Sequence, residues 1–183
     1  MLKIYMGSIL ASTEFTKFDL GITSDTTLSL IGRWLRVKEN GAIFDDSGFT
    51  IAQRPWRVPV TIDEVIFDTP VIRIGILYDR ELRMIKLLKA LKEYNVDLIV
   101  GYLKSENYNP YELIASGWGC AQTIGSPVVI VNFTPETLCY SLFFKMDETN
   151  DGIVSLSEKY TMVSIPVEKK EITGNKKEQY KGK

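Results

Sequence analysis

Histidine is absent from the 183 residues of this sequence, and cysteine occurs only twice, as Cys120 and Cys139. Without an imidazole, the chain cannot form a Ser-His-Asp or Cys-His catalytic centre or a histidine-ligated metal site. The two cysteines form no C-x-x-C pair, so they indicate neither a disulfide framework nor a zinc site. These absences predict a non-enzymatic protein with no catalytic residues, in which Cys120 is a buried structural thiol.

Long apolar runs and a strong charge excess are also absent. No stretch of about 20 apolar residues occurs, and Met1–Tyr5 lacks the basic segment and apolar run of a signal peptide. The formal net charge is −1, whereas nucleic-acid-binding proteins usually carry a marked basic excess. The sequence therefore predicts a cytoplasmic protein with no cofactor and no specific nucleic-acid sequence as its partner.

The composition that is present is that of an ordinary globular protein. Hydrophobic residues make up 45% of the chain and charged residues 25%. A chain of this length can bury one full-sized core. We expect a single α+β domain over residues 1–167, followed by a mobile, lysine-rich tail over residues 168–183.

The order of hydrophobic patterns predicts a mostly antiparallel sheet with two packed amphipathic helices. The two helices are expected at residues 26–40 and 80–94, because apolar side chains recur there with helical spacing. Short β-rich runs predict the strands, and a stretch rich in Asn, Pro, Ser and Gly predicts a loop over residues 104–126. The expected strands are residues 4–10, 61–67, 71–78, 97–103 and 127–133.

Two further runs near the end of the chain alternate apolar and polar residues. Residues 138–146 and 154–162 both show this two-residue period, and a turn-rich segment at residues 149–152 separates them. Alternation of this kind is typical of half-buried strands. The pattern predicts a long C-terminal β-hairpin.

A calcium-loop pattern overlaps the turn of this hairpin. Residues 147–158 place oxygen-bearing side chains where an EF-hand loop has its ligands, with Gly152 at the sharp turn. The candidate ligands are Asp147, Thr149, Asp151 and Glu158. Because both flanks alternate like strands, a plain hairpin turn is the competing interpretation, and a single Ca²⁺ site remains as the alternative.

Basic residues and tryptophans mark two candidate contact surfaces. A basic helix face and the lysine-rich tail could together meet an anionic membrane or a nucleocapsid, although a solvated helix face and a solubilising tail would look the same. The residues concerned are Arg83, Lys86, Lys89 and Lys92 on the helix and Lys176 and Lys177 in the tail. Trp56 and Trp118 are candidate anchors for self-association into a homo-oligomer.

The order of features from residue 53 to residue 91 resembles part of a rhabdovirus matrix protein of the small plant-virus type. The resemblance includes Arg54-Pro55-Trp56, the run Val71–Ile76, and Tyr78-Asp79-Arg80-Glu81 leading into a helix. A Pro-Pro-x-Tyr budding motif and a basic N-terminal segment, common in such proteins, are missing. The resemblance implies a self-assembling virion protein that bridges nucleoprotein and the inner face of a membrane.

The leading sequence-based hypothesis is therefore a non-enzymatic viral structural protein of matrix type. Two alternatives stay open at this point. One is a calcium-binding protein that uses the loop at residues 147–158. The other is a phage tail or capsid subunit, since a strand-rich domain with a long hairpin suits tube or shell assembly.

Overall fold

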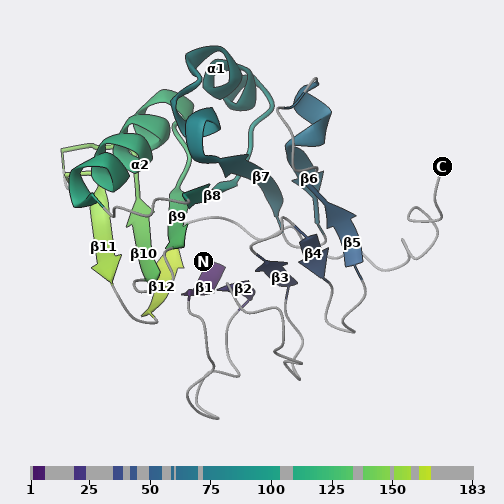
Figure 1. Cartoon of the computed structure of the whole chain (residues 1–183), viewed down its shortest axis with the longest axis horizontal. Helices are drawn as coiled ribbons and strands as arrows, with labels where there is room; N and C mark the ends of the chain where they lie inside the picture. Colours follow the sequence, from purple (N-terminus) through teal and green to yellow (C-terminus); the bar gives the residue numbers. More distant parts are fainter. Residues whose placement is uncertain are drawn as a thin grey trace, which may run out of the picture.

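The computed structural model of the chain shows an α+β fold built on two six-stranded sheets (Figure 1). The structure describes residues 2–6, 19–23, 35–38, 42–44, 50–54, 59, 61–69, 72–103, 109–133, 138–148, 151–157 and 161–165. The lysine-rich segment at residues 168–183, including Lys176 and Lys177, lies outside this part of the chain.

Sheet A has the strand order β12-β1-β2-β3-β4-β5. Its strands are β1 (Leu2–Met6), β2 (Leu20–Thr23), β3 (Leu35–Lys38), β4 (Ala42–Phe44), β5 (Thr50–Gln53) and β12 (Thr161–Ile165). Strands β1, β2 and β3 are parallel to one another, and the remaining pairings are antiparallel. The last strand, β12, pairs with β1, so the two ends of the described chain meet in this sheet.

Sheet B has the order β11-β10-β9-β8-β7-β6. Its strands are β6 (Ile66–Asp68), β7 (Arg73–Tyr78), β8 (Leu98–Leu103), β9 (Val128–Phe133), β10 (Leu138–Phe143) and β11 (Ile153–Ser157). The three central strands β7, β8 and β9 are parallel, so their carboxyl ends lie at the same edge of the sheet.

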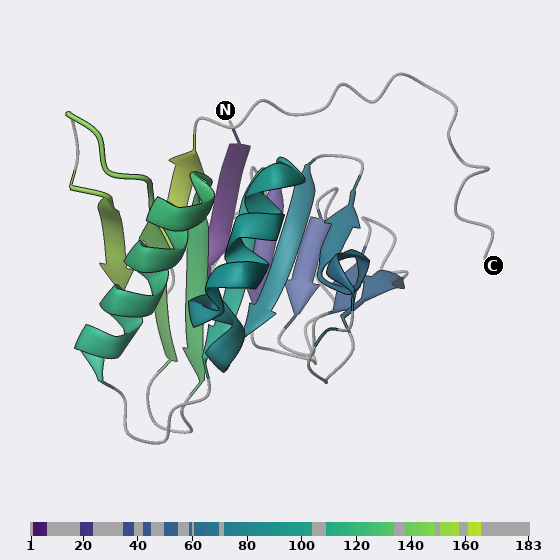
Figure 2. The same cartoon turned by 90° about the horizontal axis from the view of Figure 1, so that it is seen from above.

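A layer of helices covers the face of sheet B that points away from sheet A (Figure 2). Its elements are the short 3₁₀ helices η2 (Ile62–Glu64) and η3 (Asp79–Arg83) and the α-helices α1 (Ile85–Glu93) and α2 (Pro110–Ile124). Helix α1 follows β7 and leads into β8, and α2 leads from β8 into β9. Such crossover helices are what joins parallel strands.

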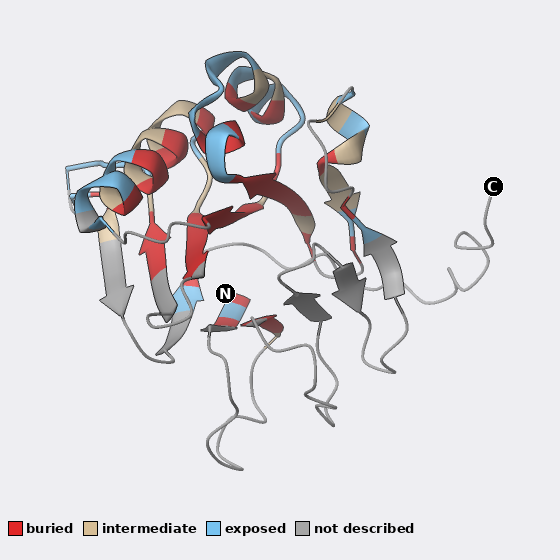
Figure 3. Ribbon diagram, in the orientation of Figure 1, coloured by how far each residue is buried: buried red, intermediate tan, exposed pale blue. Residues whose placement is uncertain are grey.

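Sheet B separates two hydrophobic cores, as the burial colours show (Figure 3). The core between the sheets contains Leu2 and Ile4 of sheet A together with Ile74, Ile76 and other residues of sheet B. The core under the helices includes Leu88 and Leu91 of α1 and Cys120 and Ala121 of α2. Because both faces of the central strands are buried, these strands are apolar over most of their length rather than alternating.

Local sequence signals explain where helix α2 begins and ends. Asn109 caps the amino end, where its side-chain oxygen accepts a hydrogen bond from the Tyr111 amide at 3.0 Å. Pro110 occupies the first turn, where no amide donor is needed. Gly125 ends the helix with a left-handed φ of 84°, a conformation that glycine adopts without a Cβ penalty.

Helix α2 overturns the expected loop at residues 104–126. The sequence offers few strong helix formers here, and serine and glycine predicted a loop. These small residues are what lets the helix pack closely on the sheet. The expected helix at residues 26–40 is also wrong in part, because residues 35–38 form strand β3; residues 24–34 lie outside the described residues.

The arrangement of strands is more mixed than expected. The strands at residues 71–78, 97–103 and 127–133 and the helix at 80–94 are confirmed, with α1 beginning at Ile85 after η3. Each sheet is mixed: antiparallel pairings are in the majority, as expected, but three neighbouring strands in each sheet are parallel, which the sequence did not predict. The structure agrees with the prediction in its α+β class and in having two α-helices among the described residues.

The C-terminal hairpin is confirmed in its first half. Strands β10 and β11 pair antiparallel, with Tyr140 opposite Ser157 and Leu142 opposite Ser155. The second alternating run does not continue as one strand, because residues 161–165 form β12 and pair with β1 in the other sheet. The hairpin therefore belongs to sheet B, and the chain then crosses to sheet A.

Two glycines in α2 give a matched pair of predictions for the packing of this helix. A Cβ at Gly117 would overlap the ring of Phe143, whereas a Cβ at Gly119 would meet nothing within 4 Å. We expect Gly117→Ala to lower the free energy of unfolding by about 1–3 kcal/mol through overpacking. Gly119→Ala should raise it by up to about 1 kcal/mol through helix propensity. Urea denaturation tests both, and a stable Gly117→Ala variant would contradict the packing described.

Candidate functional site

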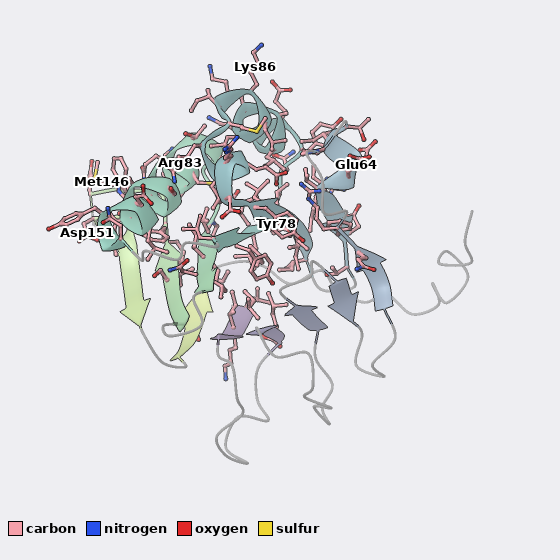
Figure 4. The ribbon with its side chains drawn as sticks, viewed as in Figure 1. Glu64, Tyr78, Arg83, Lys86, Met146 and Asp151 are labelled. Carbon is pink, nitrogen blue, oxygen red and sulfur yellow. The ribbon has the colours of Figure 1, made fainter. Side chains whose placement is uncertain are left out.

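The candidate site lies where the parallel strands of sheet B end. Tyr78 is the last residue of β7, and Tyr102 stands next to the end of β8 at the opposite register position. In sheets of this kind, ligands bind beyond the carboxyl ends of the strands, because the loops there are free to vary. Figure 4 shows Tyr78 on the side of sheet B that faces sheet A, in agreement with its place in the core between the sheets.

A strained turn directly follows β7. Asp79 has a φ of 35°, which is in the left-handed region, and it begins η3 immediately after the strand ends. Aspartate reaches this region more easily than most residues, yet left-handed backbone in a non-glycine residue is uncommon. Such strain clusters at functional sites, where the surrounding structure maintains it. The turn leaves Asp79 exposed at the strand end.

A buried ion pair holds this turn. Arg54 follows β5 of sheet A, and its Nη2 lies 2.5 Å from Glu81 Oε1. The side chain of Arg54 is fully buried and that of Glu81 is 7% exposed. The other carboxylate oxygen of Glu81 accepts a hydrogen bond from the Tyr78 amide at 2.9 Å. One carboxylate therefore joins the strand end, the first turn of η3 and a residue of the other sheet.

Arg54 makes two further contacts with β7. Its Nε donates to the Ile76 carbonyl at 3.2 Å, and its guanidinium carbon lies 5.1 Å from the centre of the Tyr78 ring. The Tyr78 ring in turn stacks on Tyr102, with 6.0 Å between the ring centres. A buried arginine is costly unless its donors are satisfied, and planar guanidinium groups suit both carboxylates and aromatic faces. We call Arg54 and Glu81, with the turn they hold, the Arg54–Glu81 bracket.

Tyr78 and Asp79 are adjacent in the sequence, but the Tyr78 side chain is buried and Asp79 is exposed. Burial raises the pKa of Tyr78 to about 12, Arg54 acts to lower it, and Glu81 acts to raise it further. The phenol therefore stays protonated at neutral pH. Asp79 instead stands in solvent at the start of η3. The arrangement thus combines an accessible carboxylate with a rigid, buried support, which is what a general base needs.

The two cysteines lie on α2 and β10, not in the turn that follows β7. Cys120 is a fully buried residue of α2, and burial raises the pKa of its thiol to about 12, so the reactive thiolate is not formed near neutral pH. The expectation that Cys120 is a structural thiol agrees with this position. Cys139 is part of β10, and its side chain lies outside the described residues.

The predicted calcium ligands are flanked by strands in the structure. Asp147 and Asp151 are exposed, and Asp151 Oδ1 accepts a hydrogen bond from the Ile153 amide at 2.9 Å. Thr149 and Glu158 lie outside the described residues. Within the described part of the chain, no group of three or more acidic or cysteine side chains is placed to hold a metal ion. The four-ligand calcium site stays a prediction.

The predicted contact residues are distributed over different parts of the fold. Arg83 ends η3, and Lys86, Lys89 and Lys92 are exposed on α1, as the helical spacing indicated. Trp118 is part of α2, not of a loop; it is partly buried, and its indole nitrogen donates to the Asp151 carbonyl at 3.2 Å. Trp56 lies outside the described residues. Trp118 and the three lysines of α1 therefore lie on elements other than the turn that follows β7.

Sequence reasoning missed the residues of this site. Arg54 and Asp79 are named above only within the segments that resemble a rhabdovirus matrix protein, and neither was a candidate site residue. The Arg54–Glu81 ion pair joins residues 27 positions apart in the sequence, and no local sequence pattern indicates such a contact. The one usable signal was a charged pair, Asp79 and Glu81, directly after an apolar strand.

In the part of the chain that the structure describes, no helix has the length and the apolar character of a membrane-spanning segment.

Sequence comparison identifies no relative: no protein-family model and no curated protein matches the chain. Solved structures do match it. A variant of the amidase from Nesterenkonia sp. AN1, with the acetamide moiety of fluoroacetamide added covalently at its active-site cysteine, is similar with a TM-score of 0.57 and 9% identity. The match covers 90% of each chain.

Two other solved structures are similar to the same extent. A Saccharomyces cerevisiae member of the nitrilase superfamily has a TM-score of 0.56 and 9% identity, and the match covers 88% of this chain and 89% of that one. The glutamine-dependent NAD⁺ synthetase from Acinetobacter baumannii has a TM-score of 0.57 and 12% identity. The match covers 88% of this chain but only 45% of the synthetase.

These comparisons correct the sequence-based hypotheses. The similar structures are amidases and other members of the nitrilase superfamily, not rhabdovirus matrix proteins, so the matrix resemblance was wrong. The non-enzymatic virion and the tail or capsid interpretations are wrong for the same reason, because the fold neighbours are enzymes. The matrix resemblance depended on a strand followed by a capped helix, an order that many α/β folds share. What the likeness establishes for this chain is its fold, which it shares with these structures.

Proposed function

We propose that this chain is a hydrolase that cleaves the carbon–nitrogen bond of small amides, with Asp79 as its general base. The observation that carries the proposal is the strained, exposed carboxylate at the carboxyl end of β7. The fold neighbours support the reaction class, since they include amidases and a carbon–nitrogen hydrolase. Fold alone does not specify a reaction, so the site has to supply the argument.

The proposed reaction needs only one side chain to move a proton. The Asp79 carboxylate takes a proton from a water molecule while the water oxygen bonds to the amide carbonyl carbon. Asp79 then returns this proton to the nitrogen as the carbon–nitrogen bond breaks, which releases a carboxylic acid and ammonia or an amine. General acid–base catalysis of this kind contributes about 10²–10⁴-fold to a rate.

The Arg54–Glu81 bracket is the positioning element in this proposal. Because Glu81 binds the Tyr78 amide, the backbone just before Asp79 cannot rotate without breaking a buried hydrogen bond. Arg54 holds Glu81 in turn, through a contact that is shielded from water. The bracket thus keeps the carboxylate of Asp79 at one place at the edge of the sheet, as catalytic geometry requires.

The experiment that tests the proposal is ammonia release from a panel of small aliphatic amides by the purified chain. We expect turnover, and we expect a Cys120→Ala/Cys139→Ala variant to retain it, because the carboxylate route uses no thiol. Loss of turnover in the cysteine variant, with the fold intact by circular dichroism, would replace the carboxylate with a thiol nucleophile. Absence of ammonia release from every amide tested would refute the proposed function.

A further inference from the structure

Basic residues recur at every third position from η3 into α1. They are Arg80, Arg83, Lys86, Lys89 and Lys92, and all of them are exposed. A 3₁₀ helix has three residues per turn, so Arg80 and Arg83 lie on the same side of η3. In α1 a step of three residues turns by about 300°, so the three lysines spread over the exposed side of this helix. We call these residues of η3 and α1 the basic row.

The basic row differs from the arginines that hold the fold together. The buried Arg54 and the partly exposed Arg73 each bind a carboxylate of another strand or helix. In the part of the chain that the structure describes, by contrast, no side chain of the basic row forms an ion pair or a hydrogen bond with another residue. The net charge of the whole chain is only −1, so this accumulation does not reflect a generally basic protein. The row therefore leaves its cations available for an external partner.

The placement of these charges is unfavourable for the helix that carries them. Lys86 lies in the first turn of α1, where the helix dipole disfavours cations, and this turn contains no acidic residue. Like charges one turn apart, such as Lys86 and Lys89, also repel each other. Departures from local rules of this kind are found where function requires them. The charges thus indicate a role other than the stabilisation of α1.

Two exposed aliphatic side chains lie within the basic row. Met84 is 40% exposed and Ile85 is 53% exposed, at the junction of η3 and α1 between Arg83 and Lys86. Single exposed apolar residues are common on protein surfaces, but here two are adjacent and cations flank them on both sides. A partner that matches this surface needs carboxylates for the cations and an apolar side chain for the aliphatic pair.

We propose that the basic row is the docking surface for an acidic segment of another protein, a role that does not depend on the proposed hydrolysis. The segment places Asp or Glu side chains against the cations and an apolar side chain against Ile85. Complementary charges of this kind raise the association rate and select the partner. From Lys86 to Lys92 the row is about 9 Å long, a distance that about three residues of an extended chain span.

The surroundings of the row favour a narrow peptide over an anionic membrane or a single-stranded nucleic acid. Figure 4 shows Lys86 at the top of the helix layer and Asp151 at its edge beside α2, and the neighbouring Asp147 and Glu148 are exposed as well. A flat anionic membrane across this layer would be repelled by these acidic residues, whereas a peptide can follow α1 alone. Single-stranded nucleic acids stack their bases on aromatic side chains, but the apolar pair within the row is aliphatic.

Fluorescence anisotropy of a labelled synthetic peptide tests the proposal. The peptide consists of about four Glu-Glu-Leu repeats and is titrated with the full chain at about 150 mM salt. We expect binding at micromolar protein, and at least tenfold weaker binding of a Gln-Gln-Leu peptide and of a Glu-Glu-Gly peptide of the same length. The first comparison isolates the contribution of the charges, and the second isolates that of the apolar contact.

Charge reversal then locates the binding surface. Lys86→Glu/Lys89→Glu should weaken binding of the Glu-Glu-Leu peptide at least tenfold. The control Lys3→Glu/Lys145→Glu changes the net charge by the same amount at exposed positions outside the row and should alter binding by less than about twofold. Circular dichroism verifies that both variants are folded.

Three outcomes would overturn the proposal. One is the absence of binding of the Glu-Glu-Leu peptide to the wild type, and another is an equal loss of binding in the two charge-reversed variants. The third is tighter binding of phosphatidylserine vesicles or of oligouridylate than of the peptide, because a membrane or a nucleic acid would then be the better partner.

Discussion

Replacement of Arg54 by leucine is expected to lower the free energy of unfolding by about 3–5 kcal/mol, which is the typical cost of breaking a buried ion pair on one side. The leucine leaves the Glu81 carboxylate in a dry environment without its cationic partner. It also removes the donor to the Ile76 carbonyl and the guanidinium that lies over the Tyr78 ring. Chemical denaturation with urea measures the loss directly.

A double-mutant cycle separates the pair from its individual partners. Arg54→Leu/Glu81→Leu should lose less stability than the sum of the two single variants, because no uncompensated charge is left behind. Asp68→Ala provides the matched control: it breaks the Arg73–Asp68 pair, whose side chains are 33% and 57% exposed, and should cost about 1 kcal/mol or less. Equal losses for the buried and the exposed pair would contradict the description of the Arg54–Glu81 bracket.

The parts of the fold that local patterns could predict are those with a clear period or cap. The apolar runs at β7, β8 and β9, the amphipathic helix α1 and the turn between β10 and β11 were all expected from sequence. Helix α2 was not, because Ser116, Gly117 and Gly119 lower the helix propensity of its middle and packing on sheet B stabilises it. Parallel pairing was missed as well, since it is decided by the crossover helices.

The candidate site could not be predicted, because its contacts are made between distant parts of the chain. Arg54 and Glu81 come from segments that belong to different layers, and each looks like an ordinary surface charge in the sequence. Asp79 is the first residue of η3, and Tyr78, not Asp79, is the cap of that helix. The left-handed backbone of Asp79 is imposed by the tertiary structure around it, which no window of sequence describes.

The second large effect is expected at Asp79. Asparagine has nearly the same shape as aspartate and also adopts left-handed backbone, so Asp79→Asn should keep the turn and remove only the charge that accepts the proton. If Asp79 is the general base, kcat/KM for amide hydrolysis should fall by about 100-fold or more. The melting temperature should change by no more than a few degrees, since an exposed side chain contributes little to stability.

The most direct test of the account is kcat/KM for ammonia release by Asp79→Asn, measured beside the wild type and beside Asp63→Asn, which changes an exposed aspartate on η2. The account predicts a loss of about 100-fold or more for Asp79→Asn and wild-type activity for Asp63→Asn. Equal activity in all three proteins would show that the carboxylate at the end of β7 takes no part in the reaction.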